Sequence, residues 1–227
     1  FDEFSGNSFE HRRQWIVDRI NHLAATFAID VCAYSVMSNH YHLVLRLSPS
    51  KSKHWSQAEI IRRWQNLYSG GELVRAYQSG ESLSEAQRFA LDSKTELWRE
   101  RLSDLSWFMR CLNEHIAVLA NKEDECTGRF WEGRFKSQAL LDEAALITCM
   151  AYVDLNPIRA NMAKTPETSA YTSIRERIRE HLGLSHCAKE LLLMEGDTAI
   201  STGLPFRLTD YLELVDWTGR AIRADKS

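Results

Sequence analysis

Hydrophobic positions near the start of the chain first follow a helical period and then a strand period. Apolar residues recur every three to four positions from residue 8 to residue 27, which predicts an amphipathic helix. Residues 29–37 and 40–47 are then read as two strands joined by the short link Ser38-Asn39. Two strands with such a link predict a β-hairpin.

The middle of the chain is predicted to be mainly helical. Residues 55–101 have a helical pattern that is broken at Gly70-Gly71 and at Ser79-Gly80, so we expect an inserted helical segment. Residues 103–120 carry a strong apolar stripe and predict a helix capped by Ser103. Residues 129–141 are interpreted as a third strand, in which Gly133 would form a bulge.

The last part of the chain again predicts helices. Asp142 is a good N-cap for a helix that runs to about Leu155, and Pro157 fits the first turn of a further short helix. Beyond residue 165 the pattern predicts three more helices and one loop. The helices are expected at 171–182, near 189–195 and from about Thr209 onward, with the loop near 185–188.

This order of elements predicts an α+β fold with a ferredoxin-like antiparallel sheet and packed helices. The core would comprise residues 1–48 and 103–165, with a helical insertion at 49–102 and a helical C-terminal extension at 166–227. The first strand of the ferredoxin-like pattern would precede residue 8. Because the chain begins without an initiator methionine, we expect it to be a fragment of a longer gene product.

Composition narrows the class of protein. The 227 residues are 44% hydrophobic and 26% charged, as in soluble globular proteins, and no apolar run approaches the ~18 residues of a membrane span. The five cysteines form no Cys-x-x-Cys pair, which favours reduced thiols in the cytoplasm over a structural zinc site. A net charge of −3 counts mildly against a nucleic-acid binder.

His40 and His42 are the first candidates for chemistry. Residues two apart on a strand point to the same face, so their imidazoles would lie side by side and could hold a metal ion. Taken alone, two half-buried histidines with ordinary neighbours are the better interpretation.

Tyr152 and Asn156 strengthen the metal hypothesis. They are four residues apart and so share a helix face, which could lie over the two histidines. Two imidazole nitrogens and the Asn156 oxygen would leave positions open for a phosphate oxygen, which suits Mg²⁺ or Mn²⁺ as a Lewis acid. Tyr152 would then be a nucleophile toward phosphorus. Taken singly, Tyr152 is better explained as a core aromatic and Asn156 as a helix-end residue.

A third feature is the alternation of basic and aromatic residues at 129–136. Arginines and lysines hold phosphates while aromatic rings stack on bases, which is the usual combination for single-stranded nucleic acids. An equally good interpretation makes the aromatic residues core and the charges solvated. The candidate DNA-binding residues are Arg129, Trp131, Arg134, Phe135, Lys136 and Arg159.

Together these motifs resemble a known family. His40-Tyr41-His42 matches the His-hydrophobic-His motif of the HUH single-tyrosine transposases. Residues 128–137 (GRFWEGRFKS) and 152–160 (YVDLNPIRA) are similar to signatures of the REP-associated tyrosine transposases, which are relatives of insertion-sequence transposases. The resemblance covers residues 8–48 and 103–163. The insertion at 49–102 is longer than the family's usual link, and the extension has no counterpart in short members.

The resemblance implies a role for each matched position. Tyr152 corresponds to the nucleophile that forms a 5′-phosphotyrosine link, while His40, His42 and Asn156 correspond to the ligands of Mg²⁺ or Mn²⁺. The implied substrate is single-stranded DNA with a hairpin, and the implied activity is DNA transposition in the cytoplasm of a bacterium, at the nucleoid. A monomer and a homodimer that exchanges its tyrosine helices are both compatible with the sequence.

Two other functions stay open. The protein could be a domesticated relative that binds DNA without cutting it. It could also be a metal-dependent phosphodiesterase that uses activated water, with Tyr152 as a structural residue.

Overall fold

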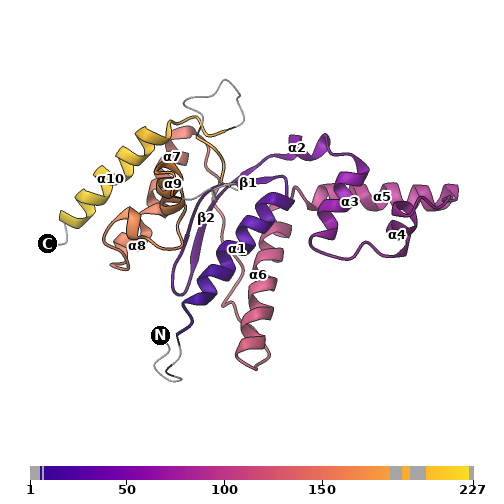
Figure 1. Cartoon of the computed structure of the whole chain (residues 1–227), viewed down its shortest axis with the longest axis horizontal. Coiled ribbons are helices and arrows are strands. Elements are labelled where there is room, and N and C mark those ends of the chain that lie inside the picture. Colours follow the sequence, from indigo (N-terminus) through magenta and orange to yellow (C-terminus); the bar gives the residue numbers. More distant parts are fainter. Residues whose placement is uncertain (1–5, 7, 185–190, 195–202, 225–227) are drawn as a thin grey trace. The chain divides into compact units, whose positions relative to one another are not determined.

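The computed structural model describes residues 6, 8–184, 191–194 and 203–224 (Figure 1). It is an α+β structure whose described strands form one two-stranded antiparallel sheet. The strands are β1 (Ile29–Val36) and β2 (Tyr41–Leu47). The helices are α1 (His11–Thr26), α2 (Pro49–Lys53), α3 (Gln57–Gln65), α4 (Glu72–Gln78), α5 (Glu85–Arg101), α6 (Leu105–Glu123), α7 (Glu143–Asp154), α8 (Asn156–Arg159), α9 (Ser173–His181) and α10 (Leu208–Ala224), with a 3-10 turn at Pro166–Thr168.

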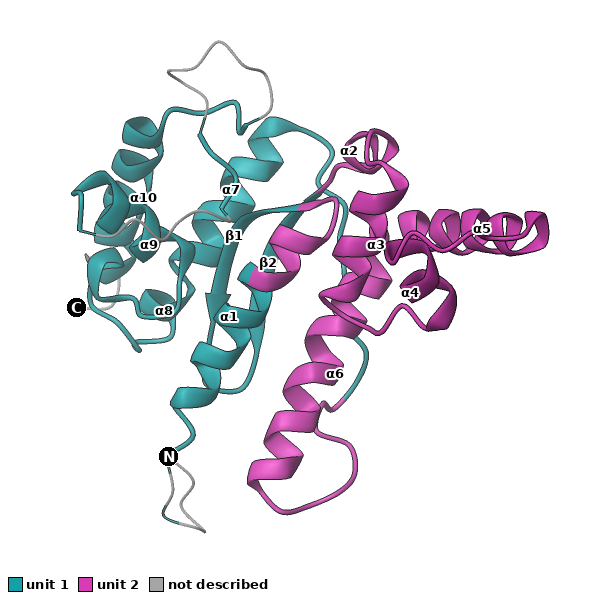
Figure 2. Ribbon diagram, turned by 45° about the vertical axis from the view of Figure 1, so that its right-hand side comes forward, with its two compact units in different colours: residues 1–21, 30–46, 133–227 teal, residues 22–29, 47–132 magenta. Residues whose placement is uncertain are grey.

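The chain divides into two compact units (Figure 2). Unit 1 comprises residues 1–21, 30–46 and 133–227, and unit 2 comprises residues 22–29 and 47–132. Unit 2 therefore contains the segment predicted as an insertion together with α6. Unit 1 contains most of the hairpin, α7, α8 and the segment predicted as an extension.

The predicted hairpin is confirmed. The Met37 amide donates to the His40 carbonyl oxygen at 2.8 Å and closes the turn between β1 and β2. The free edge of β1 is occupied by later parts of the chain, since the Val36 amide donates to the Tyr171 carbonyl at 3.0 Å and the Leu192 amide donates to the Val31 carbonyl at 2.8 Å. Both edges of β1 are thus paired, which explains why it is almost entirely buried.

The predicted strand at 129–141 is wrong, because these residues have neither strand nor helix structure. A strand needs an edge with which its amides and carbonyls can pair, and the outer edge of β1 is already taken by residues 171 and 191–192. The segment also contains Gly133, Glu132 and Lys136, and these residue types are depleted in strands. Residues 129–136 therefore do not present their basic and aromatic side chains from a strand.

The helix predictions are mostly confirmed, with shifts at the ends. The breaks at 69–71 and 79–80 separate α3, α4 and α5 as expected. α6 is capped by Asp104, whose carboxylate accepts from the Trp107 amide at 2.8 Å, and not by Ser103. The Ser103 hydroxyl is used elsewhere, because it donates to the Arg99 carbonyl oxygen. Asp142 caps α7 as predicted and accepts from the Ala145 amide at 2.7 Å.

Among the described residues after 165, the α-helices are α9 and α10. α9 and α10 match the predicted helices at 171–182 and from about Thr209. The helix predicted near 189–195 is wrong over its described residues, because 191–194 form isolated bridges, one of them to β1. The predicted loop near 185–188 lies outside the described residues. Within the part of the chain that the structure describes, no helix is both long and apolar enough to span a bilayer.

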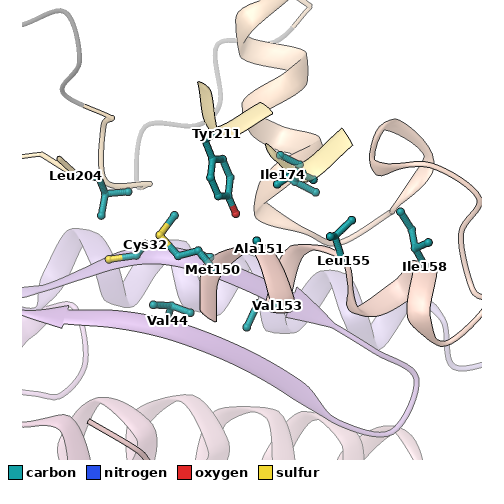
Figure 3. Packing of buried hydrophobic residues seen from close by; sticks show 12 residues of the cluster. Cys32, Val44, Met150, Ala151, Val153, Leu155, Ile158, Ile174, Leu204 and Tyr211 are labelled. Atoms are coloured by element: carbon teal, nitrogen blue, oxygen red, sulfur yellow. The ribbon is translucent and has the colours of Figure 1, made fainter. Parts of the chain in front are cut away.

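One hydrophobic cluster organises unit 1 (Figure 3). It joins the hairpin to α7, α8, α9 and α10, and the ring of Tyr211 points from α10 toward the residues of α7. Burial of each large apolar side chain contributes roughly 1.5–3 kcal/mol, so the cluster fixes how α7 lies in unit 1. Its buried residues are Cys32, Ala33, Val44, Met150, Ala151, Val153, Leu155, Ile158, Ile174, Leu204, Tyr211 and Val215.

Unit 2 has a core of its own. The indole rings of Trp64 in α3 and Trp98 in α5 stack with centroids 4.9 Å apart and an interplanar angle of 7°. Phe27 and Phe108 meet edge to face at 5.4 Å. These contacts explain why the apolar positions of the predicted insertion follow a helical period.

Candidate active site

The two histidines are side by side at the start of β2, as the sequence predicts. The ring centroids of His40 and His42 are 5.0 Å apart with an interplanar angle of 85°. His40 Nδ1 lies 2.7 Å from the Asn39 side-chain oxygen, which can only accept. This contact uses Nδ1 of His40, so Nε2 is the ring nitrogen that Asn39 does not engage.

The protonation state of His42 also favours ligation. Burial lowers the pKa of His42 below its ordinary value, and the neighbouring His40 lowers it further. His42 is therefore neutral near pH 7. Neutral imidazole is the form that binds metal ions.

Tyr152 lies next to this imidazole pair. Its flanking residues on α7, Ala151 and Val153, are buried in the core, whereas the Tyr152 side chain is 47% exposed. The Tyr152 and His42 ring centroids are 6.3 Å apart at an interplanar angle of 80°. A phenol that stays accessible to solvent beside two imidazoles is not packed as an ordinary core aromatic.

Arg159 approaches the same phenol from α8. Its guanidinium carbon lies 5.0 Å from the centroid of the Tyr152 ring. α7 ends at Asp154, and Pro157 lies in the first turn of α8, where its missing amide costs nothing. The direction change between the two helices brings Arg159 back over Tyr152. The site thus combines His40, His42, Tyr152 and Arg159.

Asn156 differs from these four residues because it is buried, with 9% of its surface exposed. Its side-chain nitrogen has no hydrogen-bond partner among the described residues. An unsatisfied buried amide costs about 1–3 kcal/mol. The two ends of an amide are nearly equivalent in shape, so rotation would present the oxygen where the nitrogen now lies.

Of the three predicted metal ligands, the structure brings His40 and His42 together. The described residues contain no group of three or more His, Cys, Asp or Glu side chains that could hold a metal. The structure records no contact between Asn156 and the two imidazoles among the described residues, so Asn156 as the third ligand stays a prediction. Mixed nitrogen and oxygen donors with vacancies suit Mn²⁺ or Mg²⁺.

The predicted DNA-binding residues are distributed over the two units. Trp131 in unit 2 is half-buried, and its indole N–H donates to the Asn113 carbonyl at 2.9 Å, so it has a packing role there. Arg129 in unit 2 is exposed, as are Arg134 and Lys136 in unit 1. Phe135 is half-buried, and Arg159 is the predicted DNA-binding residue that lies against Tyr152.

Sequence reasoning missed a buried polar group next to the site. Asp154 is an acidic residue between two buried apolar neighbours, and it is itself fully buried. An isolated acid between Val153 and Leu155 is the one signal that could have indicated it. Its partners Ser173 and Tyr211 lie 19 and 57 residues away, and no local pattern identifies them.

Comparisons with models of protein families, with curated proteins and with solved structures gave no match.

Proposed function

We propose that this protein is an HUH-type endonuclease and strand-transferase that cuts single-stranded DNA with Tyr152 and acts as a transposase. The observation that carries the proposal is the convergence of an exposed tyrosine, two adjacent imidazoles and an arginine in unit 1. A ferredoxin-like core belongs to the same proposal, and β1 and β2 would be two of its strands.

The proposed reaction is a transesterification at phosphorus. The Tyr152 phenolic oxygen attacks the scissile phosphate, its proton leaves to solvent, and the bond from phosphorus to the 3′ oxygen breaks. The 3′ oxygen takes up a proton and leaves with the upstream strand. The strand 3′ of the cut stays on the enzyme, joined through its 5′-phosphate to Tyr152 as a phosphotyrosine ester. Attack by a 3′-hydroxyl reverses the step and joins strands, because the ester preserves the energy of the bond.

His40, His42 and Asn156 would hold a divalent ion, Mg²⁺ or Mn²⁺. When bound, such an ion polarises the phosphate and neutralises charge that builds on its oxygens. The hydrogen bond from His40 Nδ1 to Asn39 orients the first imidazole for this role, as outer partners of metal-bound histidines usually do. The lowered pKa of His42 keeps the second imidazole in its ligand form.

Arg159 would attract the phosphate to the phenol. A guanidinium presents several N–H donors in a plane and binds phosphate oxygens well. Because its carbon lies 5.0 Å from the Tyr152 ring, a phosphate bound by Arg159 would be within reach of the phenolic oxygen.

The proposed partner is single-stranded DNA that carries a hairpin. The exposed Arg129, Arg134 and Lys136 would contact its phosphates, and the half-buried Trp131 and Phe135 would contribute aromatic surface. We further propose a cytoplasmic bacterial protein that works at the nucleoid as a monomer or homodimer.

A denaturing gel tests the chemistry. Hairpin DNA labelled 3′ of the cut is incubated with the protein in EDTA, and Mn²⁺ or Mg²⁺ is then added. We expect label at the mass of the protein, dependent on the ion and absent from the His40→Ala/His42→Ala variant. Free cut ends without adduct would instead indicate activated water, and bound but uncut DNA would indicate a binding protein.

A further inference from the structure

Two neighbouring residues of α7 have opposite environments. Tyr152 is 47% exposed, whereas Asp154, two residues later, has no exposed surface. At about 100° per residue, the two side chains lie about 200° apart around the helix. Any rotation or shift of α7 that moved the phenol would therefore also move the buried carboxylate.

The carboxylate of Asp154 is held by the segment after residue 165. Its Oδ1 accepts from the Ser173 hydroxyl at 2.5 Å and from the Ile174 amide at 2.9 Å. Its Oδ2 accepts from the Tyr211 hydroxyl at 2.5 Å. Ser173 and Ile174 form the first turn of α9, where a negative charge is favoured, and Tyr211 belongs to α10.

The same segment also holds β1. The Ser173 hydroxyl accepts from the Tyr34 amide at 2.9 Å, so one oxygen connects the strand to Asp154. One turn later, the Arg177 guanidinium donates to the Cys32 carbonyl at 2.9 Å. β1 leads directly into the turn that carries His40, and α7 carries Tyr152. α9 therefore links the two elements that supply the candidate site.

We propose that Asp154, Ser173 and Tyr211 are positioning residues that hold Tyr152 against the His40–His42 pair. This inference rests on the proposed function and assigns a role to the C-terminal segment. The three residues act as a clamp between α7, α9, α10 and β1. They do not touch the reacting atoms.

A positioning role explains why an acid is buried here, where burial raises the pKa of its carboxyl group. Burial of a carboxylate is expensive, and apolar residues of similar size often stabilise a core equally well. Hydrogen bonds of defined direction instead fix one geometry, which apolar packing does less strictly. For a nucleophile, a displacement of about 1 Å can reduce the rate by about 100-fold.

The test compares variants that loosen the clamp with one that weakens the core elsewhere. Ser173→Ala removes the hydroxyl that joins β1 to Asp154, and Tyr211→Phe removes the donor from α10. Ile20→Val is the matched control, because Ile20 is fully buried in α1 and lies outside the cluster around α7. Kinetic and binding measurements and one spectroscopic measurement are made on the full chain. The former are the rate of adduct formation at saturating hairpin DNA and the DNA affinity. The latter is the nuclear Overhauser effect between the ring protons of His42 and Tyr152.

We expect Ser173→Ala and Tyr211→Phe to form adduct about 10- to 100-fold more slowly, with DNA affinity within about twofold of wild type. The ring contact between His42 and Tyr152 should weaken in both variants and persist in Ile20→Val. Rates equal to that of Ile20→Val, or an unchanged ring contact, would overturn the clamp. Absence of adduct in the wild-type protein would refute the proposed function. The nuclear Overhauser effect between His42 and Tyr152 would still test the clamp, because its measurement needs no reaction.

Discussion

The hydroxyl of Tyr211 should contribute far more to stability than that of Tyr152. Tyr211 is fully buried and donates a 2.5 Å hydrogen bond to Asp154 Oδ2, whereas Tyr152 is 47% exposed. Replacement by phenylalanine preserves the ring at both positions and removes only the hydroxyl. A hydrogen bond contributes about 1 kcal/mol net, and a buried oxygen left without its donor costs about 1–3 kcal/mol. We therefore expect Tyr211→Phe to lower the free energy of unfolding by about 2 kcal/mol.

Urea unfolding, followed by both circular dichroism and tryptophan fluorescence, measures this difference. With a slope of about 2 kcal/mol per molar, a loss of about 2 kcal/mol lowers the urea midpoint by about 1 M. Tyr152→Phe is the matched control and should stay within about 0.5 kcal/mol of wild type.

A double-mutant cycle with Asp154→Asn tests whether the effect comes from the pair. Residues that share a buried hydrogen bond show coupling energies of about 0.5–3 kcal/mol. Additive effects of Tyr211→Phe and Asp154→Asn, or a loss below about 0.5 kcal/mol for Tyr211→Phe alone, would refute the reasoning.

Three further predictions concern metal binding, DNA binding and pH. Asn39→Ala should weaken Mn²⁺ binding about tenfold in calorimetry, because the neighbouring imidazole loses the acceptor that orients it, and unchanged affinity would count against the assignment. Changing Arg129 and Lys136 together to glutamine should reduce the slope of log affinity against log salt by about 1.4. A slope equal to that of the wild-type protein would show that neither side chain contacts DNA phosphates. A hydrogen bond from Arg62 is the largest of the effects that lower the pKa of Glu59 from 4.5 to about 2, so the ion pair stabilises the protein above pH 4.5 and is lost as the pH falls toward 2. Glu59→Gln should be less stable than wild type by up to about 1 kcal/mol at pH 7 in urea unfolding, and a gap that did not narrow toward pH 2 would contradict this.

Local patterns predict the elements that carry the candidate site. The hairpin of β1 and β2 follows from two short strand-like runs joined by a tight link, and the start of α7 follows from its N-cap Asp142. The adjacent rings of His40 and His42 follow from the two-residue period of a strand. These features depend on residues close together in the sequence, which is why the sequence suffices.

Features that depend on distant partners could not be predicted in this way. The segment 129–141 contains aromatic residues, which are common in strands. The outer edge of β1, however, is already paired with residues 171 and 191–192. Asp154 would be read as a solvated helix residue, although α9 and α10 supply its donors. Which residues pair over such separations is decided by packing of the whole unit.

The bond between Tyr152 and DNA is the central claim, and peptide mass spectrometry tests it most directly. Trypsin cleavage after Lys136 and Arg159 would release residues 137–159, which contain Tyr152 as their one tyrosine. After reaction with hairpin DNA, Mn²⁺ and nuclease trimming, we expect this peptide to carry a nucleotide on Tyr152, and the Tyr152→Phe variant to carry none. A nucleotide on another residue, or cleavage by Tyr152→Phe at the wild-type rate, would contradict the account.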